Sequence, residues 1–483
     1  MGHVFSRGAA LAAVLLLQVA CGDDGDPAGP SGSGASGSGG EASGGAGTGG
    51  GGGGCVDCPV EHVWSRRFGG PGDDTAAASF DAAGGALVAC RFRGTVDLDG
   101  HELVAANAAD GERDGCVVRL DAEGGAAWAH AFGATATGSM FAAPVTDAAG
   151  NILAATTFAG FVALGDEPLA SNGGLDVGLL TLSNDGMVLS GTSFGAAGDQ
   201  HIISTAASPS ALLATGGFEG SLDSLQSEGA VDVWVGSFVD GQPAWLRSFG
   251  SVGLEGAYDI APTPDGGLVI IGGFEGTLDF GGRPLVSAGS FDGFLVKLDG
   301  AGNHVWSKRF GDAEGFIYLA MDVDQETGDV AVVLGTKQTV DFGGGPLPAS
   351  GGFDVVVARL DAAGAHLWSK RWNDTGEQSG VAIAATASAT VVAGDFQGSL
   401  DAGGGAMHSA GGSDVFVVGL DGDGNHVWSK RFGDGANQAL TSVVIDGQGR
   451  VLLAGAFAGV VDLGGGPLES AGGTDMFVAL LAP

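Results

Sequence analysis

The chain is 483 residues long and 44% hydrophobic, so it has enough apolar side chains for a large core despite its 95 glycines. Its 56 acidic and 19 basic residues give a formal charge of −37. That charge argues strongly against nucleic acid as a partner, because phosphates need clustered lysine and arginine. It also disfavours contact between the folded part and an anionic membrane surface.

Residues 1–20 are expected to be an export signal. Arg7 precedes an apolar run over residues 9–19 that is too short to span a bilayer comfortably and is typical of a signal-peptide core. The run ends in Leu-Gln-Val-Ala-Cys, which resembles a bacterial lipobox with Cys21 as the lipidated residue. In lipoproteins of this kind, Gly22 after the cysteine implies passage to the outer membrane. A secreted or periplasmic form without the lipid is the alternative.

Residues 21–60 are predicted to be a flexible tether. Between residues 22 and 54 the chain is almost entirely Gly, Ser and Ala with a few acids, and cannot bury enough apolar surface to offset chain entropy. A glycine-rich coil of this length has an r.m.s. reach of roughly 30 Å, so we expect the folded body to hang clear of the membrane.

The remainder, residues 61–483, repeats itself with a period of about 60 residues. The segment 304–310 (His-Val-Trp-Ser-Lys-Arg-Phe) has six further copies, some of them diverged. We align the copies on one anchor position, held by Trp64, Trp128, Leu189, Trp245, Trp306, Trp368 and Trp428. A period of this length without helical periodicity predicts a unit of four short strands.

The third strand of each unit opens with an aspartate, which gives seven units: Asp114, Asp176, Asp232, Asp292, Asp354, Asp414 and Asp475. Gly- and Asn-rich connections predict antiparallel pairing in chain order. Because one four-stranded sheet cannot cover both of its faces, we predict an all-β fold, a single seven-bladed β-propeller. The last unit lacks its fourth strand, so residues 62–68 are expected to pair with residues 475–481 and close the ring.

These units resemble the SBBP repeat, a family named for seven-bladed β-propellers. The resemblance rests on residues 68–74 (Phe-Gly-Gly-Pro-Gly-Asp-Asp), on the Gly-x-Val/Leu-Asp-Phe-Gly-Gly loops and on the Asp-Val-Phe-Val strands. It covers roughly residues 60–483 and implies architecture, whereas propellers host adhesion, binding and enzymatic roles alike.

Residues that recur in every unit are interpreted as structural, because a single active site depends on residues that do not recur. The aspartates of the third strands are expected to accept backbone N–H groups from the preceding turn. The tryptophans are expected to pack between blades.

One recurring feature is a candidate metal site. Acidic residues occupy five of the seven loops that lead into the innermost strands, and we expect them to ring one mouth of the central channel: Asp73, Asp74, Asp199, Glu255, Glu314 and Glu377. The loop at residues 133–138 has no acid, and the last loop offers Gln438 instead. Such oxygen ligands could hold Ca²⁺ or another divalent ion, and the sequence points firmly to no cofactor. The alternative is that these acids solvate turns. Residues 421–425 and 322–326 also have alternating oxygen ligands, but a simple turn is the preferred interpretation.

Cysteine usage in an exported protein points to disulfides. Cys90 and Cys116 take the places of a glycine and a bulky residue that face each other on neighbouring strands in other units, so we predict that they form a bridge. Cys55 and Cys58 are then left to pair with each other.

No catalytic set stands out in the sequence. We therefore expect a non-catalytic interaction or adhesion scaffold, a monomer whose only membrane contact is the lipid and whose partner is a protein or a glycan. Residues that break the repeat would mark the partner site: Arg91, Arg93, Glu112 and Arg113 in the first unit, and Phe316, Tyr318 and Lys337 in the fifth. The rival hypothesis is a metal-dependent hydrolase or lyase that uses the acidic channel mouth.

Overall fold

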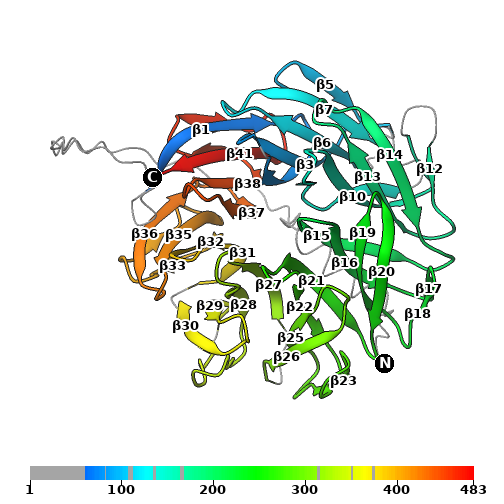
Figure 1. The fold of residues 1–483 in the computed structure, drawn as a ribbon. Helices are drawn as coiled ribbons and strands as arrows, with labels where there is room; N and C mark the ends of the chain where they lie inside the picture. The colour runs from blue at the N-terminus through cyan, green and yellow to red at the C-terminus, as the bar shows by residue number, and fades with distance from the viewer. Residues whose placement is uncertain are drawn as a thin grey trace, which may run out of the picture.

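The structure is a computed structural model that describes residues 60–81, 83–106, 113–133, 137–163, 168–312, 316–349, 352–372 and 376–483. Within these ranges all regular structure is β. The strands form seven four-stranded antiparallel sheets, the blades, which follow one another around a central axis (Figure 1). The prediction of an all-β, seven-bladed propeller is thereby confirmed.

Within a blade the strands follow one another from the innermost to the outermost. Blade 1 contains β2 (Thr75–Phe80), β3 (Ala86–Phe92), β6 (Asp114–Leu120) and β7 (Ala126–Phe132). Blade 2 contains β8 (Thr137–Phe141), β10 (Ile152–Ala159), β13 (Asp176–Leu182) and β14 (Val188–Phe194), with β9 (Val145–Thr146) also paired to β10. Blade 3 contains β15 (Gln200–Ala207), β16 (Leu212–Phe218), β19 (Asp232–Val239) and β20 (Gln242–Phe249). Blade 4 contains β21 (Glu255–Pro262), β22 (Leu268–Phe274), β25 (Asp292–Leu298) and β26 (His304–Phe310).

Blade 5 contains β27 (Phe316–Val323), β28 (Val330–Thr336), β29 (Asp354–Leu360) and β30 (His366–Trp372). Blade 6 contains β31 (Gln378–Ala385), β32 (Ala389–Phe396), β35 (Asp414–Asp421) and β36 (His426–Phe432). Blade 7 contains β37 (Gln438–Ile445), β38 (Val451–Phe457), β41 (Asp475–Ala482) and, as its outermost strand, β1 (Glu61–Phe68).

In most blades a small hairpin joins the second and third strands. These hairpins are β4 (Thr95–Leu98) with β5 (His101–Val104), β11 (Phe161–Val162) with β12 (Leu169–Ala170), β17 (Ser221–Leu222) with β18 (Leu225–Gln226), β23 (Thr277–Leu278) with β24 (Leu285–Val286), β33 (Ser399–Leu400) with β34 (Met407–His408), and β39 (Val460–Asp462) with β40 (Pro467–Glu469). Blade 5 has a single bridge, Val340 to Leu347, at the same place.

The core lies between neighbouring blades. Val269 and Ile271 of β22 share one cluster of buried side chains with Val330 and Val332 of β28. The middle strands are consequently buried along their whole length, as β22 and β28 are, because each face of a blade is covered by the next blade. Their near-continuous apolar sequences follow from this two-sided burial.

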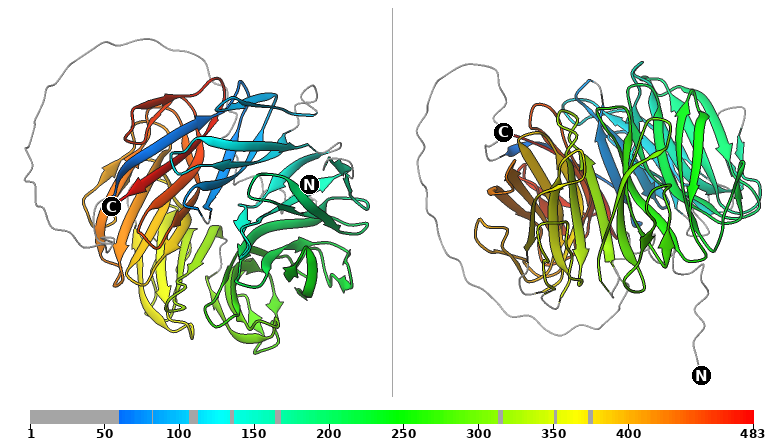
Figure 2. Two further views of the ribbon diagram at one scale, coloured as in Figure 1. Left: turned by 45° about the horizontal axis from the view of Figure 1, so that its top comes forward. Right: turned by 60° about the horizontal axis from the view of Figure 1, so that its bottom comes forward.

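The ring closes through the pairing predicted from the sequence. β1 runs antiparallel to β41, with Phe68 opposite Met476 and Glu61 opposite Ala482. The two strands lie side by side in Figure 1 and in the left view of Figure 2, β1 in blue and β41 in red. Trp64 and Phe68 are buried against this seam, so β1 contributes apolar contacts as well as backbone hydrogen bonds.

Removal of β1 is expected to abolish cooperative folding, because β41 then becomes an open edge and the contacts of Trp64 and Phe68 are lost. The comparison is between chains that begin at residue 60 and at residue 69, followed by near-ultraviolet circular dichroism during heating. A sharp transition at the same temperature in both chains would contradict the role assigned to β1.

The aspartates that open the third strands stabilise the turns before them. All seven are at most 1% exposed. In blades 2, 3, 4, 6 and 7 the amide four residues earlier donates to the carboxylate, as Asn172 does to Asp176 at 2.6 Å and Ala288 to Asp292 at 2.7 Å. In blade 1 the amide of Ala106 donates to Asp114 at 2.6 Å. The end of the outermost strand then lies over the carboxylate, so that a side chain at Gly250 would collide with Asp232.

Gly250→Ala is therefore expected to lower the free energy of unfolding by about 2 kcal/mol, the usual cost of overpacking a tight site. Gly447→Ala is the matched control, because a methyl group there meets no atom within 4 Å. Urea unfolding of both variants provides the measurement. Equal stability of the two variants would show that the carboxylate does not need the glycine.

Tryptophans of the outermost strands join each blade to the next one. In five blades the indole N–H donates to a carbonyl in the following blade's hairpin turn, at 2.9 to 3.1 Å: Trp64 to Ala122, Trp128 to Asn184, Trp245 to Gly300, Trp306 to Ala362 and Trp368 to Gly422. The recurring tryptophan thus combines apolar packing with one directional contact per blade.

The anchor position assigned to Leu189 is wrong by one residue. Ser190 lies opposite Thr181, as Trp306 lies opposite Lys297. Leu189 is the extra residue of a β-bulge, where β26 has Val305. Blade 2 therefore has serine at the tryptophan position.

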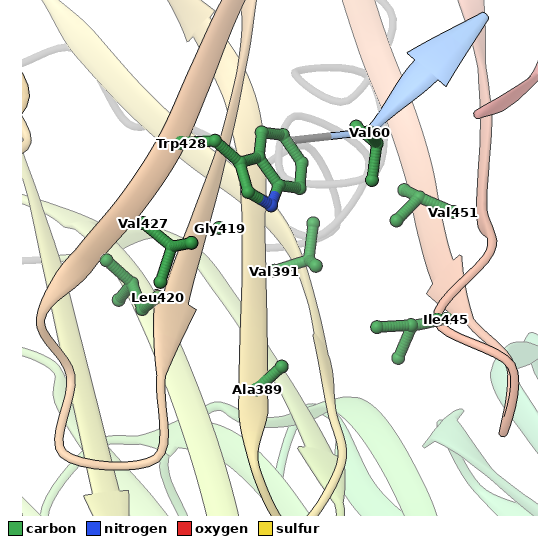
Figure 3. A pocket seen from close by; sticks show the side chains of 10 residues that line it. Val60, Ala389, Val391, Gly419, Leu420, Val427, Trp428, Ile445 and Val451 are labelled. Carbon is green, nitrogen blue, oxygen red and sulfur yellow. The ribbon is translucent and has the colours of Figure 1, made fainter. Parts of the chain in front are cut away.

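Trp428 of blade 6 has no hairpin turn to contact, because β41 and β1 are not joined by one. Elsewhere a glycine of the turn, such as Gly424, lies against the preceding tryptophan ring. Trp428 instead packs over Gly419 of its own blade, a position where a side chain would collide with the indole. With Val60 and Val391 it lines a cavity of ≈ 10 Å³, room for about one water molecule (Figure 3).

Candidate functional site

The channel mouth is formed by the loops that lead from the outermost strand of one blade into the innermost strand of the next. Because all innermost strands start at the same end of the axis, these mouth loops lie at one end of the ring. The acids predicted there do not occupy one equivalent position. The five described ones fall on two adjacent positions of the loop with different contacts.

The first position holds Asp73, Asp199 and Glu377, and it joins neighbouring blades. Each carboxylate accepts the amide that precedes the third-strand aspartate of the previous blade: Thr474 to Asp73 at 3.2 Å, Leu175 to Asp199 at 2.9 Å and Phe353 to Glu377 at 3.1 Å. In blade 7 the side-chain oxygen of Asn437 does the same for Ser413 at 3.0 Å. An uncharged oxygen therefore suffices for this contact.

The second position holds Asp74 and Glu255, both fully buried. Asp74 accepts the amide of Gly70 at 2.9 Å, and Glu255 accepts that of Ser251 at 3.2 Å. Gln200 accepts the amide of Ala196 in the same way at 3.0 Å. The side chain at this second position therefore stabilises the conformation of the mouth loop, because it accepts an amide of that loop.

Burial raises the pKa of both second-position acids. The pKa of Asp74 rises to about 6, and that of Glu255 rises to about 7, with Asp232 and Glu275 adding smaller repulsive contributions. At the rim, burial and the nearby Asp199 carboxylate raise the pKa of Glu219. The mouth thus contains carboxyl groups that can bind protons near neutral pH.

Among the residues that the structure describes, no group of three or more His, Cys, Asp or Glu side chains could hold a metal ion. Glu314 lies outside the described residues. The Ca²⁺ site at the mouth stays a prediction.

Two basic residues of blade 1 converge on one acid at the mouth. Arg93 Nη1 and Arg113 Nη2 lie 3.9 and 3.7 Å from Asp73 Oδ2. Burial and the neighbouring Arg93 lower the pKa of Arg113. Arg91 precedes them on β3, and Glu112 lies outside the described residues.

Blade 5 has a different cation at the mouth. Lys337 Nζ lies 4.1 Å from the centre of the Phe353 ring and 3.7 Å from Glu377 Oε1. Phe316 and Tyr318 lie on β27, the innermost strand of this blade. The structure thus brings Lys337 to the rim, whereas the two aromatic residues belong to the strand nearest the axis.

Three carboxylates lie between blades. The sequence does not single out Asp259 and Asp395, and it favours a turn at Asp322, whereas Asp322 belongs to β27. Asp259 of β21 accepts the Met321 amide at 3.1 Å and the Ser204 hydroxyl at 2.8 Å. Asp322 of β27 accepts the Ala385 amide at 2.8 Å. Asp395 of β32 contacts the Leu440 amide of blade 7. Burial raises their pKa values, to about 6 for Asp259 and to about 7 for Asp322 and Asp395.

Asp322→Asn is expected to stabilise the protein at alkaline pH. Because the folded-state pKa is raised, the stability linked to this carboxyl is present at low pH and is lost as the pH rises through about 7. The variant and the parent should therefore melt most nearly alike near pH 4, and the difference should grow as the pH rises from about 4 to about 7. Near pH 8 the variant should be more stable by ~2 kcal/mol.

Thermal unfolding over this pH range provides the measurement. Asp185→Asn, which changes an exposed carboxylate, is the control and should leave the pH profile unchanged. Parallel profiles for the parent and Asp322→Asn would contradict the assigned role of burial.

The opposite end of the channel has a cavity of ≈ 340 Å³ lined by blades 1, 2 and 3. Asp81 at its wall is engaged by Arg119 at 2.8 Å and by the Gly85 amide at 2.7 Å. Asp147 accepts both nitrogens of Asn151. Asp81 and Asp147, the two acids that line this cavity, thus already have hydrogen-bond partners in the turns to which they belong.

The alternating acids of residues 421–425 form a turn, as preferred from the sequence. Asp421 Oδ1 accepts the amides of Asp423 at 3.0 Å and Asn425 at 2.7 Å. In residues 322–326, Asp324 accepts the Glu326 amide at 3.0 Å and pairs with Arg359 at 3.2 Å.

Cys90 and Cys116 form the expected disulfide. They lie directly opposite each other on β3 and β6, with Cα atoms 4.9 Å apart. Both are buried, so the bond fills the face of blade 1 where four other blades pack an aromatic ring over glycine, as Phe294 does over Gly272. Cys21, Cys55 and Cys58 lie outside the described residues.

Within the described part of the chain, no helix is long and apolar enough to span a membrane. The sequence matches no protein-family model and no curated protein.

This chain is similar to several solved structures, at low identity and with TM-scores below 0.5. The β-propeller domain of the Trilobed protease from Pyrococcus furiosus is 10% identical, with a TM-score of 0.42 over 84% of this chain and 93% of that one. An ulvan lyase of family PL25 is 10% identical, with a TM-score of 0.41 over 85% and 97%. A protein of unknown function from Bacteroides caccae is 13% identical, with a TM-score of 0.30 over 62% and 94%.

Proposed function

We propose that this chain is an exported, lipid-anchored propeller of SBBP repeats that serves as a non-catalytic interaction or adhesion scaffold. Its lipid would be attached at Cys21, and residues 21–60 would tether the propeller to the outer membrane or the cell surface. The alternative is a secreted or periplasmic form without the lipid. Labelling with a radioactive fatty acid distinguishes them, because Cys21→Ala should lose both the label and the membrane association.

The observation that carries the scaffold proposal is the basic cluster of Arg93 and Arg113 beside Asp73. The positions equivalent to Arg93 in most other blades are neutral or acidic, among them Ala159, Glu219 and Glu275. A non-recurring cluster of cations at the mouth of a chain with a charge of −37 suits an acidic group on a protein or a glycan.

The test is retention of the protein on immobilised sulfated glycans, uronate-bearing glycans and acidic proteins. Arg93→Glu with Arg113→Glu should weaken the retained interaction at least about tenfold. Arg247→Glu with Arg283→Glu makes the same change of charge on exposed parts of blades 3 and 4 and should leave it intact. If the protein is retained on none of these ligands, or if both double variants lose the same amount of retention, the scaffold proposal is contradicted.

The second candidate is a metal-dependent hydrolase or lyase at the acidic mouth. The raised pKa values of Asp74 and Glu255 favour it, because proton-binding carboxyl groups near neutral pH suit acid–base chemistry. Melting temperatures in excess chelator and then in millimolar Ca²⁺, Mg²⁺ or Zn²⁺ test it. Saturation at 100 times the dissociation constant adds about 2.7 kcal/mol, so an ion-specific rise would support this candidate and no rise would remove it.

A further inference from the structure

The outermost strand of blade 2 differs from the other six outermost strands. Each of these strands is a sheet edge, paired on one side only within the described residues. Natural edge strands are protected against pairing with other chains by charged residues or proline. The other six contain at least one of His, Lys, Arg or Pro, whereas β14 reads Val-Leu-Ser-Gly-Thr-Ser-Phe and contains none.

The first half of β14 is also an apolar surface. Met187, just before the strand, is 67% exposed, and Val188 and Leu189 are 38% and 51% exposed. Three consecutive large apolar residues are therefore exposed beside a strand edge that has no pairing partner in the described part of the chain. The equivalent strands β1, β26 and β30 expose one such residue each.

Two local changes distinguish the surroundings of this edge from those of the other outermost strands. Ser190 replaces the tryptophan that crosses to the next blade elsewhere. The neighbouring turn of blade 3 is a tight Asp240-Gly241 hairpin, and Gly241 lies against Thr192 of β14. The edge is thus flanked by two exposed acids, Asp185 before the strand and Asp240 in this turn.

We propose that β14 binds an extended peptide segment of a partner that alternates apolar and basic side chains. The segment would add as a further strand and pair with the outward backbone groups of β14, as in other cases of strand addition. Its apolar side chains would cover Met187 and Leu189, and its cations would lie near Asp185 and Asp240. The charge of −37 would attract such a segment from a distance.

Charge also argues against a second copy of this chain as the occupant. Two copies paired through β14 would bring four acids together without an intervening cation on either strand. This rim surface is separate from the arginine cluster at the mouth, so its test is independent of the proposed function.

The probe is a short fluorescein-labelled peptide of alternating valine and lysine, followed by fluorescence anisotropy with the purified full-length protein. A peptide of the same charge with proline in place of every second valine is the control, because proline cannot extend a sheet. We expect the first peptide to bind at least about tenfold tighter than the second. Bound peptide should also slow hydrogen exchange at the amides of β14.

The matched variants are Leu189→Lys and Leu367→Lys. Both leucines hold the bulge position of an outermost strand, and they are 51% and 49% exposed, so the two variants change net charge equally. Leu189→Lys should weaken binding about tenfold and Leu367→Lys should not. Equal affinity for the two peptides, equal effects of the two variants, or dimerisation through β14 in sedimentation experiments would each overturn the proposal.

Discussion

Each blade of this propeller has two apolar faces that only a neighbouring blade can cover, and the rest of the structure depends on that constraint. The middle strands are buried on both sides, so their sequences tolerate few polar residues. Polar contacts between blades gather instead at the edges of the stack. At the rim, indole N–H groups donate hydrogen bonds to the next blade, and at the mouth, carboxylates accept backbone amides of the previous blade. Along the innermost strands, Asp259 and Asp322 accept backbone amides of the following blade.

Repetition made most of this architecture predictable from the sequence. Seven copies of one aspartate fixed the number of blades, and the lone strand at residues 62–68 implied the closure. The error at Leu189 has a physical cause, because a bulge adds a residue without changing the residue types around it. The acids of the channel mouth were predicted to share one loop position, and this was wrong for a related reason. Neighbouring positions such as Asp73 and Asp74 have different contacts, and loop spacing does not distinguish them.

The inter-blade carboxylates could not have been identified from the sequence. Asp259, Asp322 and Asp395 do not recur, and in the sequence they are indistinguishable from the many acids that solvate the surface. Their burial becomes visible only when the blades are placed side by side. The chain has a formal net charge of −37, and some of its acidic side chains are buried between the blades. Burial raises the pKa of these carboxyl groups, so the folded state favours their protonated form.

The closure has a mechanical consequence. Any pull on the chain before Val60 is transmitted to β1, the strand that completes blade 7 and whose Trp64 reaches into blade 1. The point where load enters the ring is therefore also the point where the ring is held together without a covalent link. Tension would act first on the hydrogen bonds between β1 and β41, and rupture there would release the strand before any other blade is strained.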